Sequence, residues 1–520
     1  MELPEIRLHI GRYLSINDLA SCILVNKLWH DTFLPYLYHK CDTDVIYQAE
    51  YWPAFKNNLQ HTRELNIFHN TLKTSDDRNT ILQKCRLLRK LSLNPANLNN
   101  RFFLRLIQQN PRLRQVYLSI GEVKEMYGNT PLAFSATSAA ATILDTIAQS
   151  CPRLTELGVD MMLHPESEKL FYGSFSRHFM PRLTKLHWSW FRLNGMETLP
   201  WMTDKYSLTV ENRSNAWCTP PDFPELKELI VYICIPEMPY PWEQELLLFQ
   251  NSPKLEVLSW SWDPTPLFGM IRYNPSRSID LFIGILCKFI ATRWLKLHSI
   301  SLSINKSSSF VFQDEHVSRV LKSLRNPLRR FELSNGNPCT ELTWQALSQH
   351  LPTIQVLHIN RDTGMELSSS EIEYVLSSGQ HLIDFQHDSV LNASDVTKNM
   401  TIDKEWPFSS SSHFRYPWAC HRLQILKIVL LRHPDDHLLN LTVFAQLAEM
   451  KELRVLHISS ENRGPEYGLN PGDYLYDLTL VESLPFDGLY DNYNQIRDHP
   501  VGKRLLVIWP RLTNCYWYNF

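Results

Sequence analysis

Glycine and paired cysteines are scarce in this 520-residue chain, and their scarcity excludes several protein classes. The 16 glycines form neither of the phosphate-binding motifs GxGxxG and GxxxxGK[ST]. The ten cysteines include no C-x-x-C pair, which argues against zinc-ribbon and thioredoxin-like sites. The enzyme motifs HExxH and GxSxG are also missing. We therefore expect no catalytic residues, no metal site and no cofactor.

An excess of charge of one sign and long apolar runs are missing as well. Lysine and arginine number 52 against 54 aspartates and glutamates, so a basic surface for nucleic acid is not expected. No apolar run approaches the ~20 residues that cross a bilayer. The segment MELPEIRLHI lacks the basic region and apolar core of a signal peptide. We expect no membrane association, free thiols, and a cytoplasmic or nuclear location.

One phrase of about ten residues recurs along the chain. In PRLTELGVDM, which starts at Pro152, the apolar residues are Leu154, Leu157 and Val159. The last two are two residues apart, so in a strand they point to one face. A short strand cannot bury that face alone, but copies stacked in a parallel sheet can, as in a solenoid. Related phrases start at Pro111, Pro181, Pro224, Pro253 and Pro510.

Stretches with helical patterning separate the phrases, at residues 101–109, 139–149, 243–250, 281–292, 315–324, 341–350 and 441–450. Strand, helix and strand in alternation predict right-handed crossovers wound into an arc. The spacing of the phrases is irregular, which indicates insertions near residues 121–138, 193–223, 392–415 and 461–500.

Residues 1–40 differ from the repeats and predict three short helices. Pro4 suits a first helical position, and an apolar stripe follows at Ile6, Ile10 and Leu14. Ser15 is expected to cap the second helix in a capping box with Asp18. The third helix is expected over residues 26–34, ended by the proline at position 35.

This N-terminal segment resembles an F-box. The resemblance rests on Leu3-Pro4-Glu5-Ile6, Tyr13-Leu14, Asp18-Leu19, Val25-Asn26-Lys27 and Trp29. The recurring phrase resembles the strand segment of leucine-rich repeats. The chain therefore resembles an F-box and leucine-rich-repeat protein of the fungal type with irregular repeats. That resemblance implies an all-α F-box over residues 1–40 and an α/β right-handed leucine-rich-repeat solenoid over residues 41–520.

The resemblance also implies a function. An F-box binds the Skp-type adaptor, and through it the cullin, of an SCF-type ubiquitin ligase, while the repeats bind a target protein. The chain would be a non-catalytic substrate-recognition subunit. By position, the adaptor-facing or supporting residues are Leu3, Pro4, Ile6, Ile10, Leu14, Leu19, Val25 and Trp29. Two alternatives remain: a binding scaffold whose helices only cap the solenoid, and an enzyme with an unrecognised site.

The target-binding candidates are the strand residues that flank the inward apolar pair. This concave face is mixed in charge and carries aromatic groups, as protein-binding surfaces do. Its candidates are Tyr117, Lys185, His187, Tyr232, Arg330 and His358. Trp190 and Trp262, near two strand exits, are either packing residues or an aromatic anchor on the rim. The sequence His433-Pro-Asp-Asp-His437 is interpreted as a solvated loop, because Pro434 prevents both histidines from sharing a helical face.

Overall fold

A computed structural model of the chain describes much of each repeat and little of the segments between repeats. The described residues are 4–48, 51–67, 72, 74–93, 100–119, 142–163, 181–192, 222–234, 246–247, 249–263, 276–304, 312–334, 341–360, 369–392, 418–431, 446–447, 449–459, 486–487 and 517–518. Almost all of the four predicted insertions, and the sequence from His433 to His437, lie outside them. Among the described helices, none combines the length and apolar character needed to cross a bilayer.

The chain forms two compact units. The first unit comprises Met1–Met238, Leu247–Leu255 and Leu267–Ile271, and the second comprises Pro239–Leu246, Glu256–Pro266 and Arg272–Phe520.

The first unit begins with helices and continues as a parallel sheet whose strands lie in chain order. Its helical elements are α1 (Pro4–Gly11), α2 (Ile16–Cys22), α3 (Lys27–Leu37), α4 (Thr43–Gln48), α5 (Trp52–Asn58), the 3-10 helix η1 (Leu59–His61), α6 (Ser75–Lys84), α7 (Asn100–Gln108) and residues 142–150. Its strands are β1 (Lys40–Asp42), β2 (Glu64–Ile67), β3 (Lys90–Leu93), β4 (Gln115–Ser119), β5 (Glu156–Leu163), β6 (Lys185–Arg192) and β7 (Glu228–Cys234).

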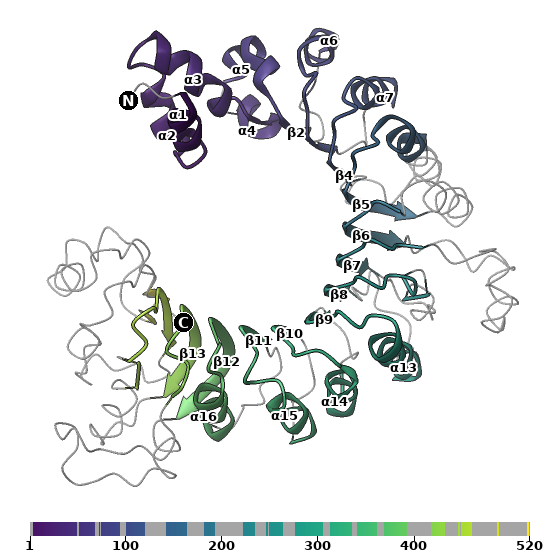
Figure 1. Ribbon diagram of the computed structural model, residues 1–520, viewed down its shortest axis with the longest axis vertical. Coiled ribbons are helices and arrows are strands. Elements are labelled where there is room, and N and C mark those ends of the chain that lie inside the picture. The colour runs from purple at the N-terminus through teal and green to yellow at the C-terminus, as the bar shows by residue number, and fades with distance from the viewer. Residues whose placement is uncertain are drawn as a thin grey trace, which may run out of the picture. The chain divides into compact units, whose positions relative to one another are not determined.

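The second unit repeats the same alternation. Its strands, again parallel and in chain order, are β8 (Val257–Asp263), β9 (Ser299–Ile304), β10 (Arg330–Ser334), β11 (Val356–Asn360), β12 (Asp384–Asn392), β13 (Ile425–Leu431), β14 (Val455–Ser459), β15 (Phe486–Asp487) and β16 (Trp517–Tyr518). Its helices are α13 (Ser276–Thr292), α14 (Asp314–Ser323), α15 (Glu341–Ser348) and α16 (Ser369–Ser378). Helices α13–α16 lie on one side of β9–β12, just as α6 and α7 lie on one side of β2–β4 (Figure 1).

A backbone pattern at the strand entrances shows that the repeats are equivalent. The carbonyl of Arg89 accepts the N–H groups of Arg114 and Gln115, at 2.8 and 3.0 Å. One repeat later, the carbonyl of Arg114 accepts the N–H groups of Thr155, just before β5, and of Glu156, its first residue. The second unit repeats the arrangement at its own strand entrances. Each turn therefore fixes the register of the next strand.

The core lies between the sheet and the helices, and the phrase that recurs in the sequence fills it. Leu154, Leu157 and Val159 are buried, as the alternation predicts. Trp188 and Trp260 occupy the same inward position in later phrases and are also buried. Trp262 is buried too, with its ring centroid 4.8 Å from that of Phe282 on α13. It is therefore a packing residue.

A buried asparagine joins two neighbouring repeats of the first unit. Asn110, which follows α7, is fully buried. Its side-chain oxygen accepts the Leu88 N–H at 2.9 Å, and its amide donates to the carbonyls of Cys85 and Leu106 at 2.9 and 2.8 Å. Since buried backbone groups need partners, this one side chain satisfies three of them.

Candidate functional site

The three N-terminal helices form a small bundle. Helices α1 and α2 both pack on α3. At Gly11 the backbone of α1 approaches α3 closely, because a Cβ there would lie 3.1 Å from the Tyr36 ring and 3.2 Å from that of Phe33. Phe33 and Leu19 are buried in this bundle.

Side-chain caps begin the second and third helices. The Ser15 hydroxyl accepts the Asp18 N–H at 3.2 Å, and the Asp18 carboxylate accepts the Ser15 N–H at 3.3 Å. This is the predicted capping box. The Asn26 side chain caps α3 by accepting the Trp29 N–H at 2.9 Å.

The third helix is longer than its sequence predicts. We expected Pro35 to end it, but α3 continues to Leu37 and the Tyr38 N–H still bonds to the Leu34 carbonyl at 3.2 Å. A proline lacks the N–H donor and its ring crowds the carbonyl four residues earlier, but only two helical residues follow Pro35, so little of the helix is affected.

The eight predicted adaptor-binding residues fall into different environments. Ile6 and Val25 are exposed, with 41% and 60% of their surface accessible. Ile10, Leu14 and Trp29 are half-buried, whereas Leu19 is in the core of the bundle. Pro4 begins α1 and nothing is described of its side chain, and Leu3 lies outside the described residues.

Further apolar side chains on the same helices are exposed, and our prediction did not include them. Tyr13, Ile16, Leu24 and Leu28 have from 54% to 82% of their surface accessible. They occupy helix ends and connections, where helical periodicity does not predict which side chains are buried. Their signal in the sequence is that apolar residues stand at positions where turns usually carry polar ones. We call these four residues, together with Ile6 and Val25, the apolar surface of the N-terminal helices.

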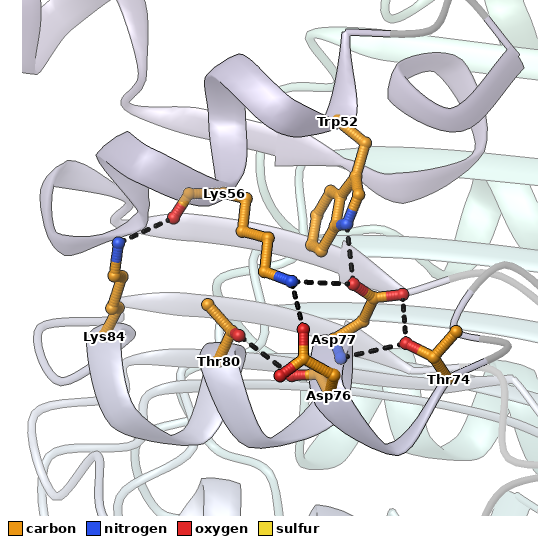
Figure 2. Close-up of polar contacts among 7 residues, drawn as sticks. All are labelled: Trp52, Lys56, Thr74, Asp76, Asp77, Thr80 and Lys84. Atoms are coloured by element: carbon orange, nitrogen blue, oxygen red, sulfur yellow. Dashed lines mark hydrogen bonds and ion pairs between the residues drawn. The ribbon is translucent and has the colours of Figure 1, made fainter.

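Helix α5 joins this bundle to the first repeat. Its Phe55 ring meets the ring of Tyr38, which follows α3, with centroids 4.8 Å apart. Its Trp52 Nε1–H donates to Oδ1 of Asp77 on α6 at 2.8 Å (Figure 2). Lys56 pairs with the carboxylates of Asp76 and Asp77.

The sheet face opposite the helices carries the predicted target-binding residues, and we call it the uncovered face because no helix among the described residues lies on it (Figure 1). In the first unit the Tyr117 side chain lies against Gly158 on the next strand. The Tyr117 hydroxyl is 3.5 Å from the Glu156 carboxylate. Lys185 pairs with Glu228 at 2.7 Å. Tyr117 and Lys185 therefore belong to one group of interacting charged and aromatic side chains on neighbouring rows.

His187 and Tyr232 lie on neighbouring strands of the same face. His187 is half-buried, and burial lowers its pKa although the charge of Asp160 acts in the opposite direction. The Asp160 carboxylate accepts the hydroxyls of Ser119 and Ser189 at 3.1 and 3.0 Å, so it bridges three strands. Tyr232 is half-buried opposite Ser189.

The second unit gathers Arg330 and His358 around two carboxylates. His358 Nδ1 lies 3.1 Å from Glu332 Oε1, and its Nε2 lies 2.9 Å from Asp384 Oδ2. The Arg330 Nε–H donates to Glu332 at 2.9 Å. These four residues come from β10, β11 and β12, and we call them the His358 cluster. Sequence reasoning placed all four residues on this face and selected the two cations as candidates, but it could not predict that the carboxylates hold them.

Neighbouring charges set the protonation of His358 and of Glu332. Burial alone would lower the pKa of His358, but bonding to Asp384 and Glu332 raises it to about 9. Burial alone would raise the pKa of Glu332, but bonding to His358 and Arg330 lowers it to about 2. At pH 7 His358 is therefore a cation and Glu332 an anion.

Among the described residues, no group of three or more histidine, cysteine, aspartate or glutamate side chains is arranged to hold a metal ion.

Comparison with solved structures gives distant likenesses. No protein-family model and no curated protein sequence matches the chain. The chain is similar to one from the crystal structure of the yeast Rad7 and Elc1 complex, with a TM-score of 0.43, 13% identity, and 90% of this chain and 94% of that chain covered. It is also similar to the leucine-rich-repeat protein LegL7 from Legionella pneumophila, with a TM-score of 0.32, 12% identity, and 76% and 93% covered.

The repeated strand and helix, their common register and the buried phrase define the class of fold. The chain is an α/β leucine-rich-repeat solenoid that begins with a bundle of three helices.

Proposed function

We propose that this chain is the substrate-recognition subunit of an SCF-type ubiquitin ligase. Its N-terminal helices act as an F-box that binds a Skp-type adaptor, and through it a cullin. Its repeats hold a target protein for ubiquitination. The chain supplies no chemistry of its own, and its contribution is to raise the effective concentration of the target near the ligase.

The apolar surface of the N-terminal helices carries this proposal. Its six members lie between residues 6 and 28 and have from 41% to 82% of their surface accessible. A bundle that served only to cap the repeats would bury its apolar side chains against them. We take these exposed apolar side chains, which all come from one short segment of the chain, as the contact residues for the adaptor.

The uncovered face supports the second half of the proposal. It places aromatic and charged groups in half-buried, mutually bonded arrangements, both around Lys185 and in the His358 cluster. Side chains that are already fixed by such bonds lose little conformational entropy when a partner binds. We propose this face as the surface for the target.

Titration calorimetry with a purified Skp-type adaptor tests the proposal. We expect the intact chain to bind, and an Ile6→Asp, Val25→Asp variant to lose affinity by at least about tenfold, which is ~1.4 kcal/mol. Both side chains are exposed, so the variant keeps its fold, which circular dichroism checks. Leu342→Asp is the matched control, because Leu342 is a 39% exposed apolar residue on α15 in the second unit.

Either of two results contradicts the proposal. A folded, intact chain that does not bind the adaptor leaves the helices as a cap and the protein as a scaffold. An equal loss of affinity in the Leu342→Asp control places the interface elsewhere.

A further inference from the structure

Two separate attachments hold helix α5 on helix α6. At the N-terminal end of α6, the Asp77 side chain has only 9% of its surface exposed and receives the Trp52 indole N–H at 2.8 Å. The Thr74 hydroxyl and Lys56 ammonium also donate to this carboxylate, at 2.6 and 3.5 Å (Figure 2). A buried carboxylate needs such donors, so losing one leaves a charge without its full set of bonds.

The second attachment lies at the other end of α6. The Lys84 ammonium donates to the carbonyl of Lys56 at 2.9 Å and to that of Asn57 at 3.3 Å. These carbonyls belong to the last turn of α5, where the helix has acceptors without intrahelical donors and where a cation is favourable. Contacts at both ends of α6 oppose rotation of α5 across it, which a single contact would permit.

Helix α5 also contacts the N-terminal bundle. Phe55 meets Tyr38 edge to face, and the Tyr38 carbonyl accepts the hydroxyl of the fully buried Thr62 at 3.2 Å. Helix α3 also packs on η1. Helix α5 is therefore one of the pieces, together with η1, through which the bundle contacts α6 and the repeats that follow.

We propose that Trp52, Asp77 and Lys84 form a positioning site that fixes the orientation of the three-helix bundle on the first repeats. A ligase receptor has to hold its target at a defined place relative to the adaptor, because ubiquitin transfer depends on proximity and orientation. This use of the site rests on the proposed function. The fixed orientation itself does not.

A distance distribution between two spin labels tests the positioning site in the full-length chain. The labels are introduced as non-canonical amino acids, so the native cysteines stay, at the exposed positions Asn17 on α2 and Gln108 on α7. We expect one narrow distribution in the wild-type chain. The Asp77→Asn, Lys84→Met variant should broaden it at least about twofold, and Trp52→Phe, which keeps the ring and loses the donor, should broaden it less.

The control variant is Asp31→Asn, Lys322→Met, which makes the same two changes at exposed positions outside the cluster. A residue that contributes only stability lowers the melting temperature and leaves the distribution of folded molecules unchanged. Equal widths in wild-type and cluster variants would overturn the inference. If the double variant does not fold, Trp52→Phe decides alone. The adaptor titration is separate, so the proposed function and this inference can fail independently.

Discussion

The imidazole of His358 on β11 lies between carboxylates on both neighbouring strands, with its Nε2 2.9 Å from Asp384 Oδ2 on β12. The strands are in register, so Asp384 is diagonal to His358 and Glu332 is directly opposite it. A histidine so placed is a cation at neutral pH, and it ties three strands of the second unit together across the uncovered face.

The His358 cluster predicts a pH-dependent stability. The pKa of His358 rises from 6.5 to about 9 on folding, so its contribution is complete below pH 6.5 and is lost as the pH rises through 9. We expect His358→Gln to lower the free energy of unfolding by about 1 to 2 kcal/mol at pH 6, a difference that shrinks towards pH 10. Denaturant unfolding across this range measures it, with the exposed His381→Gln as control.

Glu332 predicts that stability also falls at low pH. Its pKa falls from 4.5 to about 2 on folding, so its contribution is present above pH 4.5 and is lost as the pH falls through 2. Glu332→Gln should therefore destabilise the chain at pH 6 and approach wild-type stability near pH 2. A pH-independent difference would show that this carboxylate is not ion-paired.

Gly158 leaves room for Tyr117. A Cβ on Gly158 would lie 2.2 Å from Tyr117 Cδ1, so Gly158→Ala has to displace the ring. We expect a loss of about 1 to 2 kcal/mol in unfolding free energy. In a Tyr117→Ser background the same substitution should cost less, and a double-mutant cycle measures the coupling. Strict additivity would mean that the two residues do not touch.

Loss of the Asn110 side chain should strongly destabilise the first unit. Asn110→Ala leaves the Leu88 N–H and the carbonyls of Cys85 and Leu106 without their bonds, all in the core. We expect a cost of about 3 kcal/mol in thermal or denaturant unfolding. Asn17→Ala, at an exposed position, should be close to neutral. Equal effects of the two substitutions would contradict this role.

Ser15 tests the capping box beside the apolar surface. Ser15→Ala removes the hydroxyl that accepts the Asp18 N–H, and we expect about 1 kcal/mol less local stability in α2. Hydrogen exchange of the α2 amides detects this change. Ser21→Ala removes another exposed hydroxyl of the same helix and should alter the exchange less. Unchanged exchange in Ser15→Ala would show that the cap does not hold α2.

Much of the fold could be predicted from the sequence, because each copy of the repeat phrase shows the alternation of a strand and also marks where that strand begins. Leu157 and Val159 are buried as expected. The expected helix at 315–324 corresponds to α14 at Asp314–Ser323. Helices α4, α5 and α6 were missed because they are short and weakly patterned. The contacts that hold α6, such as Asp77 with Trp52, are polar and lie 25 residues apart in the chain.

The candidate site was less predictable. Strand alternation places Arg330 and His358 on one face, but only the register of three strands shows that they share the carboxylate of Glu332. The exposure of Leu24 and Leu28 depends on how the helices pack, because the same apolar residues are equally compatible with a buried core.

A hydrogen-exchange footprint of the full chain, free and bound to a Skp-type adaptor, tests the central claim most directly. We predict that the adaptor slows exchange in residues 4–29, which carry the apolar surface, and leaves the sheet strands of both units unchanged. Protection on the strands without protection of α1–α3, or no binding at all by the folded chain, would contradict the account.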